Sequence, residues 1–124
     1  MVNYKGIILS LGSNIGDRET NLSLALLELA SIAQIKSVSS IYETEALLMK
    51  NQANFYNIAI EIEYTKNANN LLDEIKTIEI NLGRKKIIRY GPRIIDIDII
   101  FFRGENISTD LLTIPHYAWR ERLF

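Results

Sequence analysis

The chain has 124 residues, of which 48% are hydrophobic and 23% are charged, with two prolines and no cysteine. This length suits one domain with its own core, and the composition is typical of a globular protein. Without cysteine, disulfides and thiolate metal sites are excluded. Apolar runs are at most four residues long, as at residues 99–102, which is far too short to cross a membrane. We therefore expect a single cytoplasmic domain over residues 1–124.

Charge is divided unevenly along the chain. Residues 1–83 carry a net charge of −4 and residues 84–124 one of +3, which leaves −1 overall. Five basic residues lie between Arg84 and Arg93, with no acidic residue among them. The molecule as a whole lacks the basic excess of a nucleic-acid-binding protein. The basic cluster instead predicts a local site for a small anionic ligand.

A strand and a helix are predicted at the start of the chain. Residues 4–11 are rich in apolar and β-branched side chains, which predicts a strand that closes at Gly12. Polar turn residues follow, and Asp17 among them can cap a helix. Apolar residues at helical spacing then predict a helix from residue 18 to about residue 34.

The middle of the chain predicts two strands separated by a loop. Residues 37–44 contain the bulky apolar side chains of a second strand. Residues 45–54 show no clear period and predict a long loop. Residues 55–64 alternate apolar and polar side chains, which predicts an antiparallel strand with one buried face.

A second helix and a last strand follow. Asn67 or Asn69 can cap the start of the helix, and Gly83 can end it. Residues 84–92 predict a basic loop, and residues 94–102 form the most apolar strand of the chain. The helix is further supported by an apolar stripe at helical spacing, which consists of Leu71, Ile75, Ile78 and Leu82.

The order of these elements predicts an α+β fold. Strand, helix, two strands, helix and strand in succession are typical of a ferredoxin-like, split-βαβ antiparallel sheet with two helices on one face. The turn residues 104–106 predict in addition a short hairpin that returns the chain to Ile107. Because this topology hosts many functions, the function must be argued from particular residues.

Two aspartates on the last strand are the sharpest chemical feature. Side chains alternate across a strand, so Asp96 and Asp98 share one face while the neighbouring isoleucines share the other. Two close carboxylates repel each other and need a positive partner. Arg89 or Arg93 could supply it as structural ion pairs, or a divalent cation such as Mg²⁺ could do so. We favour the metal, because ionisable groups in unusual places cluster at functional sites.

The basic cluster strengthens this interpretation. It leads through Gly91 and Pro92 directly into the two aspartates, so that cations and carboxylates meet. Such a place can neutralise Mg²⁺ and a polyphosphate from both sides. Arg84 and Arg93 suit bidentate contacts to phosphate, whereas Lys86 can act only as a point charge.

Other candidates have both a structural and a functional interpretation. His116, the only histidine, either packs in the fold or contacts phosphate. Asn57 either bonds to a strand edge or recognises a heterocycle, on which Phe55 could stack. Tyr90 is either an anchor or a ligand contact. The segment from Gly12 to Asp17 lacks the pattern of a phosphate-binding loop and is interpreted as a simple turn.

Several segments together resemble the 6-hydroxymethyl-7,8-dihydropterin pyrophosphokinase family of the folate pathway. They occur in the family's order and nearly with its spacing, over almost the whole chain. The segments are LGSNIGDRETNL at 11–22, SSIYET at 39–44, FYN at 55–57, IE at 78–79, LGR at 82–84, GPRIIDIDIIFF at 91–102 and LTIPHYAWRERLF at 112–124.

The resemblance implies a three-layer α/β/α fold around the ferredoxin-like core. It also implies transfer of pyrophosphate from ATP to 6-hydroxymethyl-7,8-dihydropterin, with AMP as the second product. Asp96 and Asp98 would hold two Mg²⁺ ions, and with Arg84 and Arg93 they would form the catalytic group. The ATP-binding residues would further include Glu79, Lys86, Tyr90, His116, Tyr117 and Arg122. The pterin would be bound by Thr44, Phe55, Asn57 and Phe124.

The chain departs from the family pattern in places. Residues 44–48 read TEALL where the family usually has proline and glycine. Tyr90 replaces a frequent tryptophan, and Lys86 replaces a frequent arginine. Family members usually continue beyond Phe124, so we expect the single domain 1–124 to lack the family's C-terminal segment. We also expect a monomer.

Three other functions remain open at this point. A two-metal nucleotidyl transferase on a ferredoxin-like fold would use the same aspartates but release inorganic pyrophosphate. A decayed or truncated nucleotide-binding module would bind Mg²⁺–ATP without turnover. If the aspartates were only structural, Asp96→Asn would be neutral or stabilising, and Mg²⁺–ATP would not raise the melting temperature.

Overall fold

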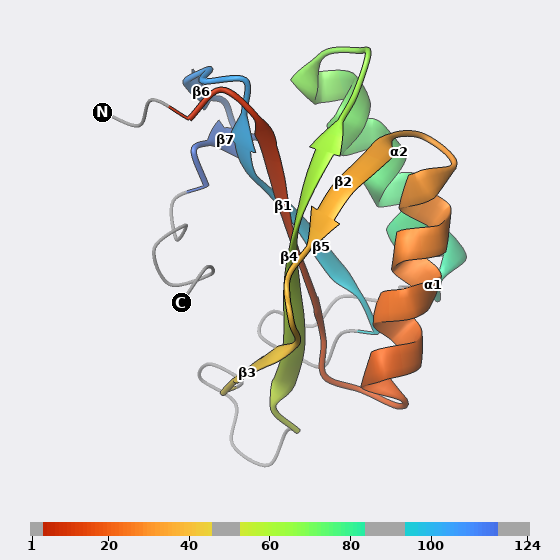
Figure 1. Ribbon diagram of the computed structural model, residues 1–124. Helices are drawn as coiled ribbons and strands as arrows, with labels where there is room; N and C mark the ends of the chain where they lie inside the picture. Colours follow the sequence, from red (N-terminus) through yellow and green to blue (C-terminus); the bar gives the residue numbers. More distant parts are fainter. Residues whose placement is uncertain (1–3, 46–52, 84–93, 117–124) are drawn as a thin grey trace.

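The computed structural model describes residues 4–45, 53–83 and 94–116 (Figure 1). In this part of the chain, a five-stranded sheet carries two helices on one side (Figure 1). The elements in chain order are β1 (Ile7–Ser13), α1 (Arg18–Ala30), β2 (Gln34–Val38), β3 (Tyr42–Thr44), β4 (Phe55–Glu63), α2 (Ala68–Asn81), β5 (Asp96–Phe102), β6 (Ile107–Ser108) and β7 (Thr113–Ile114).

The sheet has the ferredoxin-like strand order. Its strands run β2-β4-β1-β5, and β3 pairs with β4 as well. Every pair is antiparallel, so β4 lies between the two strands that α1 connects. This is the split-βαβ arrangement, and the predicted α+β fold is confirmed. Both helices of the described residues lie on one side of the sheet, so the third layer that the resemblance implied stays a prediction.

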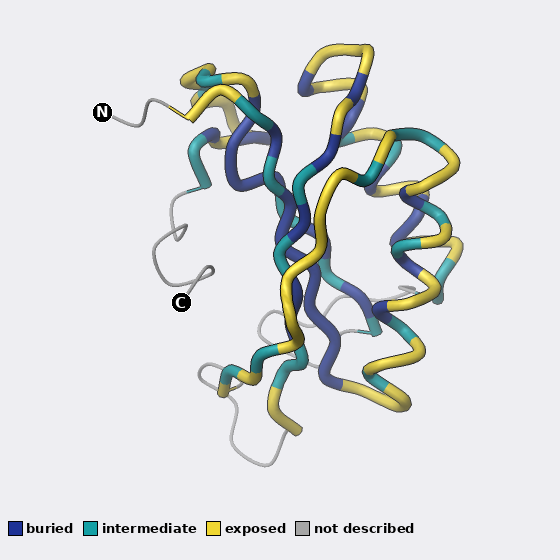
Figure 2. Tube along the Cα trace, viewed as in Figure 1, coloured by how far each residue is buried: buried dark blue, intermediate teal, exposed yellow. Residues whose placement is uncertain are grey.

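The hydrophobic core lies between this sheet and its helices. Alternate residues of β1, β4 and β5 face the helices and are buried, and Figure 2 shows them along the central strands. Removing such a side chain from water stabilises the fold by about 1.5–3 kcal/mol. The largest fully buried core side chains include Leu9, Leu11, Leu29, Ile60, Ile62, Leu71, Ile75, Ile95 and Phe102.

Both helices begin at predicted caps. The Asp17 side chain accepts a hydrogen bond from the backbone N–H of Thr20 at 3.1 Å. The Asn67 side chain accepts one from the N–H of Asn70 at 2.9 Å. Each bond satisfies a helix-start donor that has no partner inside the helix. α2 ends before Gly83, whose φ of 104° is a conformation that favours glycine.

The predicted end of the first helix was wrong. α1 stops at Ala30, and the Ser31 hydroxyl and N–H both bond to the carbonyl of Glu28. Residue 34 instead starts β2, where Gln34 pairs with Glu63 of β4. Residues 31–33 form a turn, and only Gln34 of the predicted last helical turn is paired in the sheet.

Three strand predictions also need correction. The predicted strand 37–44 is two strands, β2 and β3, which pair with different parts of β4. β1 does not close at Gly12 but continues through Ser13, because both residues still pair with β4. Ile107 does not return to β5; in β6 it pairs with Ile114 of β7.

Some predictions lie outside the described residues. Most of the predicted loop 45–54 falls there, and so does the basic loop 84–92. In the part of the chain that the structure describes, neither helix is long and apolar enough to cross a membrane.

Candidate active site

Two rows of polar and small residues cross the sheet on the face away from the helices. In the first row, Asn57 of β4 pairs with Gly12 of β1, which pairs with Asp96 of β5. Adjacent strands lie about 4.8 Å apart, so the backbones of Asn57 and Asp96 are separated by about 10 Å. The row therefore places a predicted pterin residue close to a predicted metal ligand, with only a glycine between them.

The second row lies two residues further along each strand. Ala59 pairs with Ser10, and Ser10 pairs with Asp98. Both aspartates therefore lie on the polar face, as predicted, and the isoleucines that flank them are buried on the helix face. The residues of β1 that pair with the aspartates, Gly12 and Ser10, are both small.

His116 contacts the second aspartate. Its Nε2 atom lies 3.7 Å from Asp98 Oδ1, and both side chains are largely shielded from water. The backbone N–H of His116 donates to the carbonyl of Ile100 at 3.0 Å, which fixes the histidine beside β5. The prediction that His116 belongs to this site is consistent with its position. A protonated His116 would add a positive charge next to the carboxylates.

The chemistry of these donors fits Mg²⁺. Magnesium prefers hard oxygen ligands and is commonly held by one or two carboxylates, with waters and substrate phosphates completing its coordination. Asp96 and Asp98 supply such oxygens on one face. Within the described ranges, no cluster of three or more His, Cys, Asp or Glu side chains could hold a metal. An ion here would therefore need further ligands from the substrate, as a Mg²⁺–nucleotide does.

The predicted pterin residues form a connected group at the start of β4. The Asn57 amide nitrogen donates to the Thr44 hydroxyl at 2.9 Å and to the backbone carbonyl of Tyr42 at 3.2 Å. Strand pairing also sets Thr44 opposite Phe55. Asn57 is buried, so these bonds fix the orientation of its amide before any ligand binds. The structure thus brings Thr44, Phe55 and Asn57 together.

Gly12 is a site residue that the sequence analysis missed. A Cβ atom at this position would lie 2.9 Å from Asn57 Oδ1 and 3.2 Å from Phe55 Cδ1. Only glycine lets both side chains lie this close to β1. A glycine inside a strand can mark a close approach of another group, which was the available signal. The residue had been interpreted as the end of the strand.

Two further side chains hold the segment that enters β4. The Asn14 amide donates to the carbonyl of Ala53 at 3.3 Å. Arg18 donates to the carbonyl of Asn54 at 2.8 Å, and its guanidinium lies 3.8 Å from the centre of the Tyr56 ring. Asn14 follows β1 directly, and Arg18 is the first residue of α1. They tie the end of β1 to the strand that carries the predicted pterin residues.

Glu79 lies on the opposite side of β5 from this group. It belongs to α2, is 6% exposed, and its carboxylate accepts a hydrogen bond from the backbone N–H of Ile97 at 2.9 Å. Ile97 is the residue between the two aspartates. Glu79 therefore contacts the backbone of the strand that carries the two predicted metal ligands, and its predicted contact with the nucleotide stays a prediction.

The remaining predicted site residues fall outside the described ranges. Nothing tests their predicted roles in ATP or pterin binding, which stay predictions. These residues are Arg84, Lys86, Tyr90, Arg93, Tyr117, Arg122 and Phe124.

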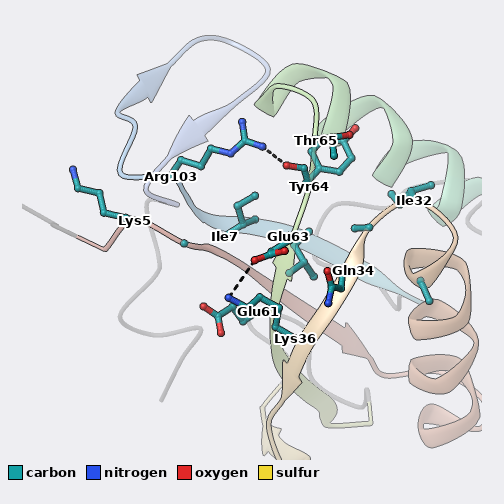
Figure 3. A pocket seen from close by; sticks show the side chains of 14 residues that line it. Lys5, Ile7, Ile32, Gln34, Lys36, Glu61, Glu63, Tyr64, Thr65 and Arg103 are labelled. Atoms are coloured by element: carbon teal, nitrogen blue, oxygen red, sulfur yellow. Dashed lines mark hydrogen bonds and ion pairs between the residues drawn. The ribbon is translucent and has the colours of Figure 1, made fainter.

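A cavity of about 800 Å³ lies elsewhere, at the opposite end of the sheet (Figure 3). Its lining includes Ile7 at the start of β1 and Glu63 at the end of β4. Lys36 forms an ion pair with Glu63 at 3.5 Å, and Arg103 donates to the carbonyl of Tyr64 (Figure 3). Both of these cations are engaged with neighbours, and the cavity contains none of the predicted site residues.

Comparison with known proteins identifies the family. The family model of 7,8-dihydro-6-hydroxymethylpterin-pyrophosphokinase matches residues 8–124. The chain belongs to this family. It is 47% identical to the 2-amino-4-hydroxy-6-hydroxymethyldihydropteridine pyrophosphokinase of Bacillus subtilis (strain 168), over 94% of this chain and 71% of that protein. It is 38% identical to the protein of the same name in Aquifex aeolicus (strain VF5), over 95% of this chain and 74% of that one.

A longer relative contains a similar region. The chain is 40% identical to the mitochondrial folate synthesis bifunctional protein of Pisum sativum, over 95% of this chain and 23% of that protein. The resemblance deduced from the sequence is thereby confirmed. Membership of this family makes the chain an ATP-dependent pyrophosphokinase and argues against a nucleotidyl transferase.

Proposed function

We propose that this pyrophosphokinase acts at the polar face of β1, β4 and β5. The reaction of the family passes the β,γ-pyrophosphoryl group of ATP to the hydroxymethyl oxygen of 6-hydroxymethyl-7,8-dihydropterin. AMP and the pterin diphosphate are the products. The observation that carries the placement is the row Asn57, Gly12 and Asp96, which brings the two halves of the site within about 10 Å.

The pterin would bind at the β3–β4 end of this row. Asn57 and Thr44 offer hydrogen-bonding groups of the kind that a pterin edge requires, and Phe55 offers a ring for stacking. Phe124 is proposed as the second aromatic contact. The bonds that hold the Asn57 amide in place mean that little side-chain freedom is lost when the pterin binds.

ATP would bind at the β5 end. Asp96 and Asp98 would hold two Mg²⁺ ions, which would neutralise charge on the phosphates and orient them. His116 beside Asp98 would contact the phosphates. Arg84 and Arg93 would stabilise the charge that develops during transfer, because guanidinium groups bind phosphate oxygens bidentately. The other proposed nucleotide residues are Lys86, Tyr90, Tyr117 and Arg122, whereas the Glu79 carboxylate is bonded to the backbone of β5.

The transfer itself needs no protein nucleophile. The hydroxymethyl oxygen of the pterin attacks the β-phosphorus of ATP, and the bond from this phosphorus to the oxygen bridging it to the α-phosphorus breaks. AMP leaves with the bridging oxygen, and the hydroxyl proton passes to solvent. The protein contributes position and neutralisation of charge, which are the main sources of catalysis in phosphoryl-type transfer.

A module that binds Mg²⁺–ATP without turnover is the alternative to test. It differs from the enzyme in its products and not in its metal site. A monomeric state and cytoplasmic localisation stay predictions. Both bear on where and how the chain works, and neither changes the chemistry proposed for the site.

Binding of a non-hydrolysable ATP analogue tests the proposed metal site. We expect Asp96→Asn to weaken Mg²⁺-dependent binding at least about tenfold in titration calorimetry, because one ligand charge is lost. Asp73→Asn, the same change at an exposed position of α2, should bind as the wild type does. Wild-type Mg²⁺-dependent binding by Asp96→Asn would contradict the proposed site.

A further inference from the structure

β5 lies at the edge of the sheet, and this creates a problem for the site. Its inner edge pairs with β1, whereas its outer edge has no neighbouring strand in the described part of the chain. Backbone groups on such an edge must bond to side chains, other segments or water. The two aspartates stand on this strand, so its rigidity decides how well their carboxylates are placed.

Glu79 provides such a partner. Its Oε2 atom accepts the hydrogen bond of the Ile97 N–H at 2.9 Å, and the contact is buried. Burying a carboxylate is costly unless it is well hydrogen-bonded, and a bond between a charged acceptor and a backbone N–H is stronger than a neutral one. An uncharged side chain at this position of α2 could be buried at a lower cost in free energy. A buried glutamate here thus calls for a specific role.

The bonded N–H belongs to the peptide that joins Asp96 to Ile97. Fixing this peptide plane restrains the backbone at Asp96 directly and at Ile97, the residue from which the chain continues to Asp98. A second contact holds the strand further along, where the His116 N–H donates to the Ile100 carbonyl. Glu79 is not a third ligand within the described residues, because no three-carboxylate cluster is formed there.

We propose that Glu79 is a positioning residue for the metal site. Through the Ile97 N–H it holds the Asp96–Ile97 peptide and so restrains the segment that carries both carboxylates. The inference rests on the proposed Mg²⁺ site and adds to it a residue on the far side of the strand. Partners that orient metal ligands commonly change metal affinity about 10- to 100-fold when they are lost.

Two substitutions separate the hydrogen bond from the charge. Glu79→Gln keeps an oxygen that can accept from Ile97, whereas Glu79→Leu keeps the approximate volume and removes the acceptor. Glu74→Leu is the matched control: Glu74 lies on the same helix, but its carboxylate bonds to Tyr64 and Lys66 and not to β5. Circular dichroism of the full chain checks that each variant is folded.

The first readout needs neither metal nor nucleotide. Hydrogen exchange of the Ile97 amide, followed by NMR, should be at least about tenfold faster in Glu79→Leu than in the wild type or Glu74→Leu, and in Glu79→Gln it should stay within a few-fold of the wild type. An unchanged Ile97 exchange rate in Glu79→Leu would overturn the inference. If that variant does not fold, Glu79→Ala, which also removes the acceptor, is measured in its place, and an unchanged Ile97 exchange rate in it would equally overturn the inference.

The second readout is the Mg²⁺ dependence of analogue binding. Glu79→Leu should require about 10- to 100-fold more Mg²⁺ than the wild type, and Glu79→Gln should require nearly the wild-type amount. Binding measured without Mg²⁺ should be the same in all three proteins. If Glu79→Leu weakens binding equally with and without Mg²⁺, Glu79 acts by contacting the nucleotide and the inference fails. If the wild type itself showed no Mg²⁺-dependent binding of the analogue, the proposed function would be refuted. The hydrogen-exchange rate of the Ile97 amide would still test whether the Glu79 hydrogen bond holds β5.

Discussion

Replacing Gly12 with alanine would place a methyl group directly against the proposed pterin site. The new Cβ would lie 2.9 Å from Asn57 Oδ1 and 3.2 Å from Phe55 Cδ1. An ordinary contact needs about 3.5 Å, so the Asn57 amide would have to move by about half an ångström or more. Overpacking of this kind costs about 1–3 kcal/mol of folding free energy. The amide would also weaken its bonds to Thr44 and Tyr42.

The expected result is a selective loss of pterin binding. Misplacing a substrate-positioning group by a fraction of an ångström to 1 Å can reduce activity by up to about 100-fold. We expect the pterin KM of Gly12→Ala to rise about tenfold or more, while its affinity for a Mg²⁺–ATP analogue changes little. Urea unfolding measures the stability cost in the same variant.

Gly16→Ala controls for a general loss of stability. Gly16 has a φ of 69°, so alanine is strained there, but its Cβ would meet only the Asn21 side chain, at 4.0 Å. This variant should lose stability and keep the wild-type pterin KM. A wild-type pterin KM in Gly12→Ala, or an equal rise in both variants, would refute the link between Gly12 and the pterin site.

Three further predictions concern single side chains. Asp98→Ala should abolish AMP formation and leave the circular dichroism spectrum unchanged; retained activity would contradict the metal assignment. Tyr64→Phe removes the hydrogen bond to Glu74 and should cost about 0.5–1.5 kcal/mol in urea unfolding at pH 7. This bond lowers the pKa of the Glu74 carboxyl below its usual value of 4.5. The stability that the bond contributes is therefore present above pH 4.5 and is lost as the pH falls below that value. A cost of Tyr64→Phe that did not depend on pH would contradict this explanation. Burial and Glu61 raise the pKa of Tyr4 to about 12. The wild type should therefore lose stability as the pH rises from 10 towards 12, and Tyr4→Phe should lose less. Equal losses of stability in the two proteins would exclude Tyr4 as the source.

The aspartate pair shows what local pattern can predict. Alternation along residues 94–102 is enough to place Asp96 and Asp98 on one face, because the two-residue period of a strand does not depend on its partners. The caps of both helices are equally local and were also predicted. Local pattern does not predict element boundaries that depend on strand pairing. The end of α1 is set by the pairing of Gln34 with Glu63, which lies 29 positions along the chain.

The shape of the site depends on contacts between distant residues. Gly12 has meaning only once the register places it between Asn57 and Asp96. The bond from Ile97 to Glu79 likewise joins a strand to a helix across 18 positions. Composition and spacing carry no information about which residues of two strands pair. The site residues could therefore be predicted from the sequence, but their positions relative to one another could not. A resemblance to known proteins supplied the reaction, and the strand pairing supplied its arrangement.

Product analysis tests the central claim most directly. The chain is incubated with ATP, Mg²⁺ and 6-hydroxymethyl-7,8-dihydropterin, with a second reaction that lacks the pterin, and the nucleotides are separated by chromatography. Pyrophosphoryl transfer at the proposed site predicts AMP in equal amount to the pterin diphosphate, and only when the pterin is present. ADP, pterin-independent AMP, or no product from a protein that still binds Mg²⁺–ATP would contradict it.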